Sequence, residues 1–288
     1  MSTNGAYLWA LVWASVISAG LGLGNGNFDD DFYIMWAPDH VTRLYNGHGV
    51  QISMDRQSGS GFATKKQYLF GKFEMQIKLP PGNSAGTVVA VYLYSNQPNR
   101  DEIDIEFLGN VDGKDIIMQT NVFANGYDDR EQRIKLWFDP TADFHTYTIF
   151  WNRYHIVFLV DGFPIRVHQN NAVRGIPFPR MQPMSLYTTI WNGESWATNG
   201  GKTKITWEPY PFVAQFRNFY IDGCEWNGNP RFCKGGSTQN WWNKRTYAYF
   251  NAGDRLKLHW VRKHYLVYDY CNDKVRFKVA PEECRYHI

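Results

Sequence analysis

Short stretches of alternating apolar and polar residues occupy the chain from about residue 28 to residue 223. Gly71–Leu79 (GKFEMQIKL) alternates strictly, and residues 87–94 (TVVAVYLY) are β-branched or aromatic. A period of two is typical of strands with one buried face. Asp161-Gly162, between FLV and FPIRV, predicts a tight hairpin. Because such segments recur with turn signals and long amphipathic helical stretches are lacking, we predict an all-β sandwich or jelly roll.

One alternating stretch, RDEIDIEF at residues 100–107, is acidic at every other position. On a strand its side chains separate into an acidic face (Glu102, Asp104, Glu106) and an apolar face (Ile103, Ile105, Phe107). Neighbouring like charges are destabilising. The alternative without a functional site is a solvated edge strand, but apolar segments on both sides favour a central strand. A calcium site is disfavoured, because a straight row of carboxylates does not wrap an ion.

This arrangement suits hydrolysis or transfer at a glycosidic bond with retention. Such enzymes hold a nucleophile and a general acid/base with carboxyl groups roughly 5–5.5 Å apart. On a flat strand the Cα atoms of Glu102 and Glu106 are roughly 13 Å apart. The pattern therefore predicts a strongly curved sheet with the acids on its hollow face. Asp104 lies between them, and coupled carboxyls spread their pKa values, so that one stays protonated and another ionised.

The first 22 residues form an uncharged, mostly apolar leader, with Ala6–Leu23 as its apolar run. We expect it to be a signal peptide that is removed on export, although it lacks a basic n-region. A membrane anchor is the alternative, but the run is short and broken by Gly20, Gly22 and Gly24. We therefore expect a secreted protein without membrane attachment after cleavage.

The C-terminal part, residues 224–288, differs in composition and contains all four cysteines. Residues 237–249 and 254–269 are expected to form two helices. Chain proximity suggests Cys224–Cys233 and Cys271–Cys284 disulfides, although three pairings are possible. A zinc site is disfavoured, because no short Cys-x-x-Cys spacing occurs. We expect residues 23–223 to be the catalytic domain and residues 224–288 a small disulfide-pinned extension docked on it.

The net charge and the aromatic content indicate which ligands the protein could bind. Net charge is only +3 with Lys and Arg scattered, so nothing indicates nucleic-acid binding. Aromatic residues make up 17% of the chain, including 12 Trp. Strand packing explains part of this excess, and the flat faces of sugar rings also suit aromatic surfaces.

Several segments together resemble the xyloglucan endotransglucosylase/hydrolases, plant members of glycoside hydrolase family 16. The stretch DEIDIEFLGN at residues 101–110 matches the family signature. Further matching segments are residues 58–86, QTNVF at 119–123, DREQR at 129–133, LWFDPTADFHTY at 136–147, SWATNGG at 195–201 and YCNDKVRF at 270–277. They follow in the family's order and cover nearly the whole chain after the leader.

The resemblance implies a concanavalin-like β-jelly-roll with an open groove and a retaining mechanism. Glu102 would be the nucleophile, Asp104 the assisting carboxylate and Glu106 the general acid/base. Implied substrate-binding positions are Gln119, Asn121, Asp129, Arg130, Glu131, Ser195, Trp196, Gly201 and Arg276. No metal or organic cofactor is implied. The partners would be a polysaccharide donor and a glucan acceptor, acted on by a monomer in the cell wall or apoplast.

Each of these binding positions also has a structural explanation. Trp196 could be ordinary core, residues 129–131 a solvated charged turn, and Arg276 an ion-pair partner.

The chain departs from the family at a few positions. Arg100 stands where the family usually has His, Ser195 where it has Asp, and Ile105 where Phe is common. The usual glycosylation sequon after the acidic strand is missing. Arg100 would favour the ionised form of Glu102, and we hypothesise that it alters donor choice or the balance of transfer and hydrolysis.

Transfer is favoured over hydrolysis by resemblance, because the connection over residues 124–128 is short where hydrolytic members carry a longer loop. The alternatives are a xyloglucan endo-hydrolase and a transglucosylase that uses cellulose or mixed-linkage glucan as donor. A non-catalytic glucan-binding module on the same fold is a further alternative, but such a module has no need of three aligned carboxyls.

Overall fold

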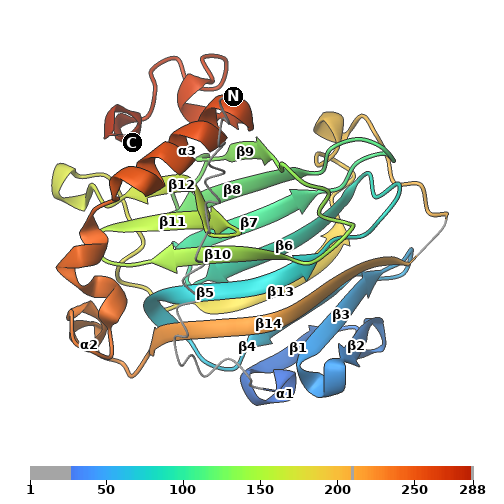
Figure 1. Cartoon of the computed structure of the whole chain (residues 1–288), viewed down its shortest axis with the longest axis horizontal. Coiled ribbons are helices and arrows are strands. Elements are labelled where there is room, and N and C mark those ends of the chain that lie inside the picture. The colour runs from blue at the N-terminus through green and yellow to red at the C-terminus, as the bar shows by residue number, and fades with distance from the viewer. Residues whose placement is uncertain (1–26, 209–210, 287–288) are drawn as a thin grey trace, which may run out of the picture.

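Two antiparallel β-sheets packed face to face form the protein, as the alternating pattern predicts (Figure 1). The structure is a computed structural model and describes residues 27–208 and 211–286. The expected signal peptide, residues 1–22, lies outside the described residues. The all-β sandwich is therefore confirmed.

The larger sheet carries the acidic strand near its middle. Its eight strands lie in the order β1 (Phe32–Trp36), β4 (Ser60–Thr64), β13 (Ser185–Asn192), β6 (Thr87–Tyr94), β7 (Glu102–Leu108), β8 (Ile117–Phe123), β9 (Gln132–Lys135) and β15 (Leu266–Asp269).

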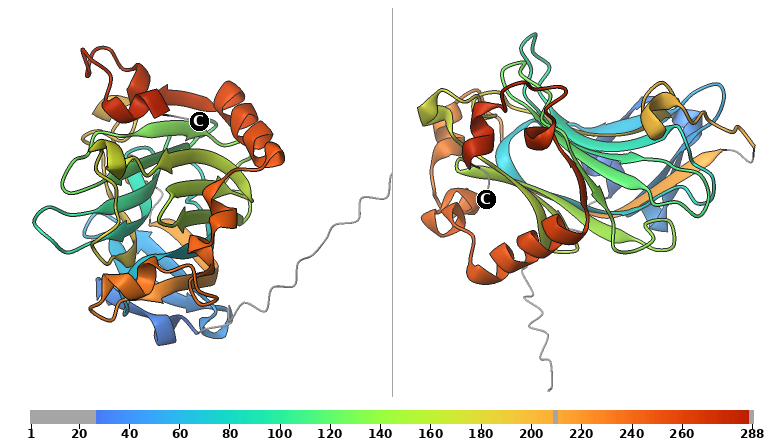
Figure 2. Two further views of the ribbon diagram at one scale, coloured as in Figure 1. Left: turned by 90° about the vertical axis from the view of Figure 1, so that its left-hand side faces the viewer. Right: turned by 90° about the horizontal axis from the view of Figure 1, so that it is seen from above.

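The second sheet covers the inner face of the first. Its seven strands lie in the order β12 (Phe163–Gln169), β11 (His155–Val160), β10 (His145–Trp151), β5 (Tyr68–Lys78), β14 (Phe212–Glu225), β3 (Gly49–Met54) and β2 (Val41–Leu44). Figure 2 shows both sheets curving together, with the C-terminal elements gathered at one end of the sandwich.

Helical elements are short and peripheral. The α-helices are α1 (Phe28–Asp31), α2 (Pro230–Lys234) and α3 (Ala252–His264); 3₁₀ turns occur at Pro38–His40, Tyr45–Gly47, Ala172–Arg174, Asn199–Gly201, Trp241–Asn243, Arg245–Ala248, Tyr270–Asn272 and Glu282–Tyr286.

The core lies between the sheets and is built from the inward-facing residues of each strand. On β7 these are Ile103, Ile105 and Phe107, each at most 1% exposed. The hairpin expected at Asp161-Gly162 is confirmed between β11 and β12. Both residues have positive φ, 48° and 74°, which a two-residue turn of this hand requires.

The C-terminal extension joins the larger sheet directly. Its β15 pairs antiparallel with β9 and so becomes the edge strand of the sheet that carries the acids. The boundary expected after Gly223 lies inside β14, which continues to Glu225. Both suggested disulfides are present, Cys224–Cys233 and Cys271–Cys284.

The helix expected over residues 254–269 is partly wrong. Helix α3 begins at Ala252, where the side chain of Asn251 caps the N–H of Asp254. It ends at His264, because residues 266–269 pair with β9 instead. Sheet pairing outweighs local helix propensity at this edge.

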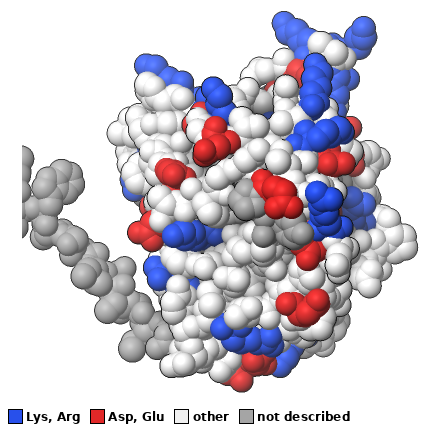
Figure 3. Space-filling view, turned by 90° about the vertical axis from the view of Figure 1, so that its right-hand side faces the viewer, with Lys and Arg blue, Asp and Glu red and all other residues white. Residues whose placement is uncertain are grey.

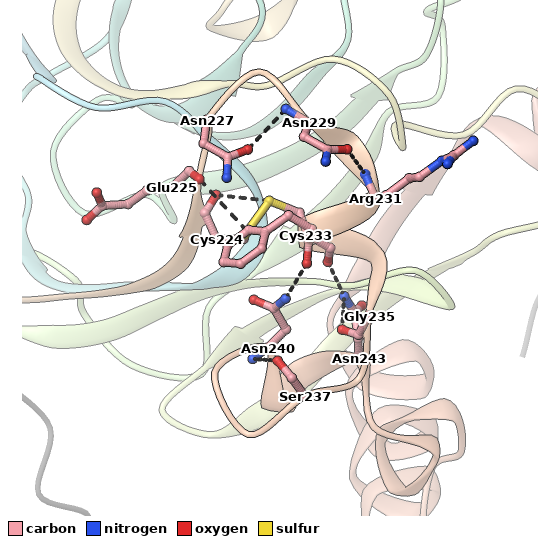
Figure 4. The surroundings of a disulfide bond; sticks show 11 residues. Cys224, Glu225, Asn227, Asn229, Arg231, Cys233, Gly235, Ser237, Asn240 and Asn243 are labelled. Carbon is pink, nitrogen blue, oxygen red and sulfur yellow. Dashed lines mark hydrogen bonds between the residues drawn. A yellow bond between two sulfur atoms is a disulfide. The ribbon is translucent and has the colours of Figure 1, made fainter.

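The helix expected over residues 237–249 is wrong, since this segment forms only two 3₁₀ turns. Buried Asn243 explains the difference. Its Nδ2 donates to the carbonyl of Cys233 at 2.7 Å, and its Oδ1 accepts from the N–H of Arg153 at 2.9 Å. Figure 4 shows Asn240 and Asn243 reaching toward the segment that holds Cys233. Such side-chain bonds compete with helical ones.

We expect the Asn243→Ala substitution to lower the free energy of unfolding by about 2–3 kcal/mol, because it leaves the buried carbonyl of Cys233 without its partner and also removes the part-buried bond from the N–H of Arg153. Chemical denaturation measures this loss. Asn227→Ala, at an exposed position of the same region (Figure 4), is the control and should change stability little. Equal losses in both variants would show that Asn243 does not anchor this segment.

Candidate active site

Strand β7 displays its three carboxyls on the face that points away from the core. It lies between β6 and β8, so the edge-strand alternative is wrong. Glu102 pairs with Tyr94 of β6 and Phe123 of β8, and Asp104 pairs with Tyr92 and Asn121. The acids are therefore held in a continuous antiparallel ladder, which fixes their spacing along the sheet.

An open hollow of about 590 Å³ lies over this face. Besides the three acids and Arg100, it is lined by Trp36, Ala90, Tyr92, Tyr94, Thr189 and Trp191. The curved sheet with acids on its hollow face is thus confirmed. The aromatic lining was not identified from the sequence. Its signal is present in β6, where Tyr92 and Tyr94 alternate with core residues and so share the face of the acids.

Glu102 forms an ion pair with Arg100, the first residue of the acidic stretch. Nε of Arg100 donates to Oε2 of Glu102 at 2.7 Å, and the guanidinium lies over the ring of Phe123 at 4.4 Å. Burial raises the pKa of Glu102, while the hydrogen bond and charge of Arg100 oppose that rise. Arg100 therefore favours the ionised carboxylate that a nucleophile needs.

Asp104 is the most enclosed of the three acids. It is 6% exposed, and its Oδ1 has no hydrogen-bond partner among the described residues. Burial, reinforced by the negative charges of Glu102 and Glu106, raises the pKa of Asp104 well above its usual range. A protonated Asp104 can donate a hydrogen bond to a neighbouring carboxylate.

Glu106 is held by a side chain from β8. Nε2 of Gln119 donates to Oε2 of Glu106 at 2.7 Å, and Oε1 of Gln119 accepts from Nε of Arg133 at 2.7 Å. Burial raises the pKa of Glu106 to about 6, while the bond from Gln119 acts in the opposite direction. Arg133 was not selected from the sequence, although it follows Glu131 at strand spacing.

The three carboxyls thus have different environments. An arginine favours the charged form of Glu102, burial and two neighbouring acids favour the neutral form of Asp104, and Glu106 keeps a raised pKa. Pairs of acids whose environments push their pKa values apart are suited to nucleophile and acid/base roles.

Asn121 organises the backbone that leaves β8. Its Oδ1 accepts from the N–H groups of Val122 at 2.9 Å and Arg130 at 3.0 Å. It faces Asp104 across the ladder, so its position beside the acids is as expected.

The charged turn before β9 is braced by the C-terminal extension. Arg276 pairs with Glu131 at 2.7 Å and with Asp129, so the ion-pair explanation of Arg276 holds in the structure. Arg130 is only 5% exposed and pairs with Glu283 at 2.5 Å. The Arg130 side chain is thus largely buried and held by Glu283.

The segment after β13 contributes Ser195, Trp196 and Gly201. Trp196 is half-buried, and its ring lies 6.1 Å from that of Trp191, which lines the hollow. Gly201 has φ 80°, and a Cβ there would meet the carbonyl of Ser195 at 1.9 Å. Gly201 thus allows a tight loop that presents the exposed Ser195.

Other kinds of site find little support in the described part of the chain. Within it, no cluster of three or more His, Cys, Asp or Glu side chains is arranged to hold a metal ion. Nor does any helix there have the length and apolarity to span a membrane. Figure 3 shows acidic and basic side chains distributed over the same face of the molecule.

Comparison with known proteins agrees with this geometry. Residues 28–209 match the family model "Glycosyl hydrolases family 16", and residues 236–284 match "Xyloglucan endo-transglycosylase (XET) C-terminus". The chain is 50% identical to probable xyloglucan endotransglucosylase/hydrolase protein 10 of Arabidopsis thaliana, over 95% of this chain and 91% of that protein. It is 47% identical to xyloglucan endotransglucosylase protein 6 of Diospyros kaki, over 97% and 95%.

Among solved structures, the Crh5 transglycosylase in complex with NAG is similar, with a TM-score of 0.56 and 27% identity. The match covers 70% of this chain and 80% of that one. The order of strands, the acidic face of β7 and these matches lead to one assignment: the chain belongs to glycosyl hydrolases family 16, within the xyloglucan endotransglucosylase/hydrolase family.

Proposed function

We propose that this protein is a retaining endo-transglucosylase that cleaves the β-1,4-glucan backbone of xyloglucan and joins the cut end to another glucan chain. The observation that carries the proposal is the pair of differently held acids on β7, Glu102 bonded to Arg100 and Glu106 bonded to Gln119. The names of its relatives support xyloglucan as the donor.

In the first step the Glu102 carboxylate attacks the anomeric carbon and forms a glycosyl-enzyme ester. The glycosidic carbon–oxygen bond breaks, and Glu106 gives its proton to the departing 4-oxygen of the leaving chain. In the second step the 4-hydroxyl of an acceptor attacks the same carbon, Glu106 takes its proton, and Glu102 leaves. Asp104 donates a hydrogen bond to the Glu102 carboxylate and so steadies it between steps.

The aromatic lining of the hollow supports sugar binding over the acids. We assign Gln119, Asn121, Asp129, Glu131, Ser195, Trp196, Gly201 and Arg276 to the surroundings of the bound chain. Arg130 acts indirectly, through the turn that it holds against Glu283.

We further propose residues 1–22 as an export signal, residues 23–223 as the catalytic domain, residues 224–288 as the extension, and a monomer acting in the cell wall. The two disulfides support an oxidising compartment.

The tight turn after β8 supports transfer rather than hydrolysis. Ala124 and Tyr127 exchange both backbone hydrogen bonds, at 2.9 and 3.0 Å, across Asn125 and Gly126. A short turn leaves the acceptor side of the groove open to a second glucan chain. Transfer dominates when that chain holds water away from the glycosyl-enzyme.

We expect labelled xyloglucan oligosaccharide to enter polymer faster than new reducing ends appear when the protein acts on xyloglucan. Counting both products in one reaction measures the ratio. Glu102→Ala should abolish both, because no glycosyl-enzyme forms. A preponderance of reducing ends would make the protein a hydrolase, and polymer remodelling by Glu102→Ala would contradict the mechanism.

We expect Gln119→Met to move the alkaline limb of the transfer rate to higher pH. The Gln119 amide stabilises the ionised form of Glu106, so its loss raises the pKa of the acid, and the protonated form that donates to the leaving chain persists to higher pH. The pH profile of kcat/KM measures the shift. Gln215→Met, which removes an amide bonded to Gln51 on the other sheet, is the control; an alkaline limb that moves equally in both variants would contradict the role of Gln119.

We expect Arg100→His to change the relative rates on xyloglucan, cellulose and mixed-linkage glucan donors. Arg100 lines the hollow, bonds Glu102 and covers Phe123, and a shorter imidazole cannot keep all three contacts. Transfer assays of both proteins with each donor measure the effect. Identical donor profiles would show that Arg100 plays no part in donor choice.

A further inference from the structure

Arg166 of β12 is a cation enclosed in the core of the sandwich. It is 1% exposed, and the ion pairs found between described side chains do not include it. Its Nη1 donates to O and Oγ1 of Thr120 at 2.7 and 3.0 Å, and its Nη2 donates to the carbonyl of Arg130 at 2.6 Å. Burying a charge without a paired countercharge is costly, and these hydrogen bonds offset part of that cost.

A bulge in the edge strand aims Arg166 inward. Phe158 pairs with Arg166 and Leu159 with Pro164, which leaves Ile165 as the extra residue between them. Ile165 and Phe158 are both in the core, and the guanidinium lies 5.6 Å from the ring of Phe158. Without the extra residue, Ile165 and Arg166 would point to opposite faces.

Thr120, which accepts hydrogen bonds from Arg166, lies on β8, next to the strand that carries the acids, and on the core side of the sheet. Thr120 of β8 pairs with Ile105 of β7, between the pairs Glu106–Gln119 and Asp104–Asn121. Because side chains alternate, Thr120 points into the core while Gln119 and Asn121 point to the acids. Holding Thr120 from inside therefore fixes the strand segment from which both of those side chains project.

The charge of Arg166 also acts on Asp104. Its attraction for Asp104 opposes the rise that burial, Glu102 and Glu106 cause in the pKa of Asp104. Other groups share this environment: Tyr92 of β6, Arg130 of the turn before β9, and Asp269 and Tyr270 of the C-terminal extension. Asp269 is already paired with Arg262, and Arg130 with Glu283. Asp269 therefore forms its ion pair with Arg262 and none with Arg166.

We propose that Arg166 is a positioning residue for the transfer reaction, which fixes β8 behind Gln119 and Asn121 and so keeps both side chains beside the acids. This inference rests on the proposed function. Through Arg166, the second sheet would contribute to the reaction that takes place on the first sheet.

Two substitutions test whether the guanidinium holds β8 in place. Arg166→Lys keeps the charge but cannot bond both Thr120 and the carbonyl of Arg130, so kcat for xyloglucan transfer should fall about tenfold. A loosened β8 also weakens the bond from Gln119 to Glu106, so the alkaline limb of kcat/KM should move to higher pH, as in Gln119→Met. Arg166→Gln, which loses both the charge and the two-sided contact, should show the same two effects.

Arg217→Gln is the matched control. Arg217 of β14, in the same sheet as Arg166, bonds Gln76 at 2.9 Å and lies over the ring of Phe144, so its loss should leave kcat and the alkaline limb unchanged. Circular dichroism and thermal melting establish that each variant is folded.

Three results would overturn the proposal: an alkaline limb of Arg166→Lys at the wild-type position, an equal shift in Arg217→Gln, or failure of both Arg166 variants to fold while Arg217→Gln folds. An absence of transfer by the wild-type protein would instead refute the proposed function, so the two failures are distinguishable.

Discussion

Mutual repulsion among three buried carboxyls is the constraint around which this molecule is arranged. Glu102, Asp104 and Glu106 project from one face of a central strand, where burial disfavours charge on each and each charge disfavours the next. A purely structural strand would avoid such a row. The surroundings instead give each acid a different environment, and the resulting asymmetry is what separates a nucleophile from an acid/base.

Arg100 is a near neighbour of Glu102 in the chain, whereas the other side chains that set these environments come from other strands. Arg100 precedes β7, Gln119 lies on β8, and Arg133, which orients Gln119, lies on β9. Arg166 reaches the back of β8 from the other sheet. The site is therefore a property of the sandwich as a whole, because the ladder fixes the acids along the sheet while the second sheet adds charge behind them.

The C-terminal extension belongs to the same arrangement. Its β15 closes the edge of the larger sheet, and Arg276 and Glu283 bind the turn that follows β8. The Cys271–Cys284 disulfide holds the ends of this segment together. Loops beside an active site are held well only when a rigid scaffold supports them, and here part of that scaffold lies outside the core sandwich.

The sequence by itself determined the sandwich, the Asp161-Gly162 hairpin and the shared face of the three acids, because alternation and turn chemistry are local. It suggested the two disulfides by chain proximity, and the structure selected them from three possible pairings. Only the tertiary structure decided the aromatic lining from Trp36 and Trp191, the bond of Arg133 to Gln119, and the burial of Arg130 and Arg166. These depend on strand order and on which sheet faces which. The helix predicted over residues 254–269 was correct as far as His264, where the change to sheet pairing with β9 ends it. The helix predicted over residues 237–249 was wrong, because Asn243 bonds Cys233 and Arg153 outside that segment, and local propensity does not register such partners.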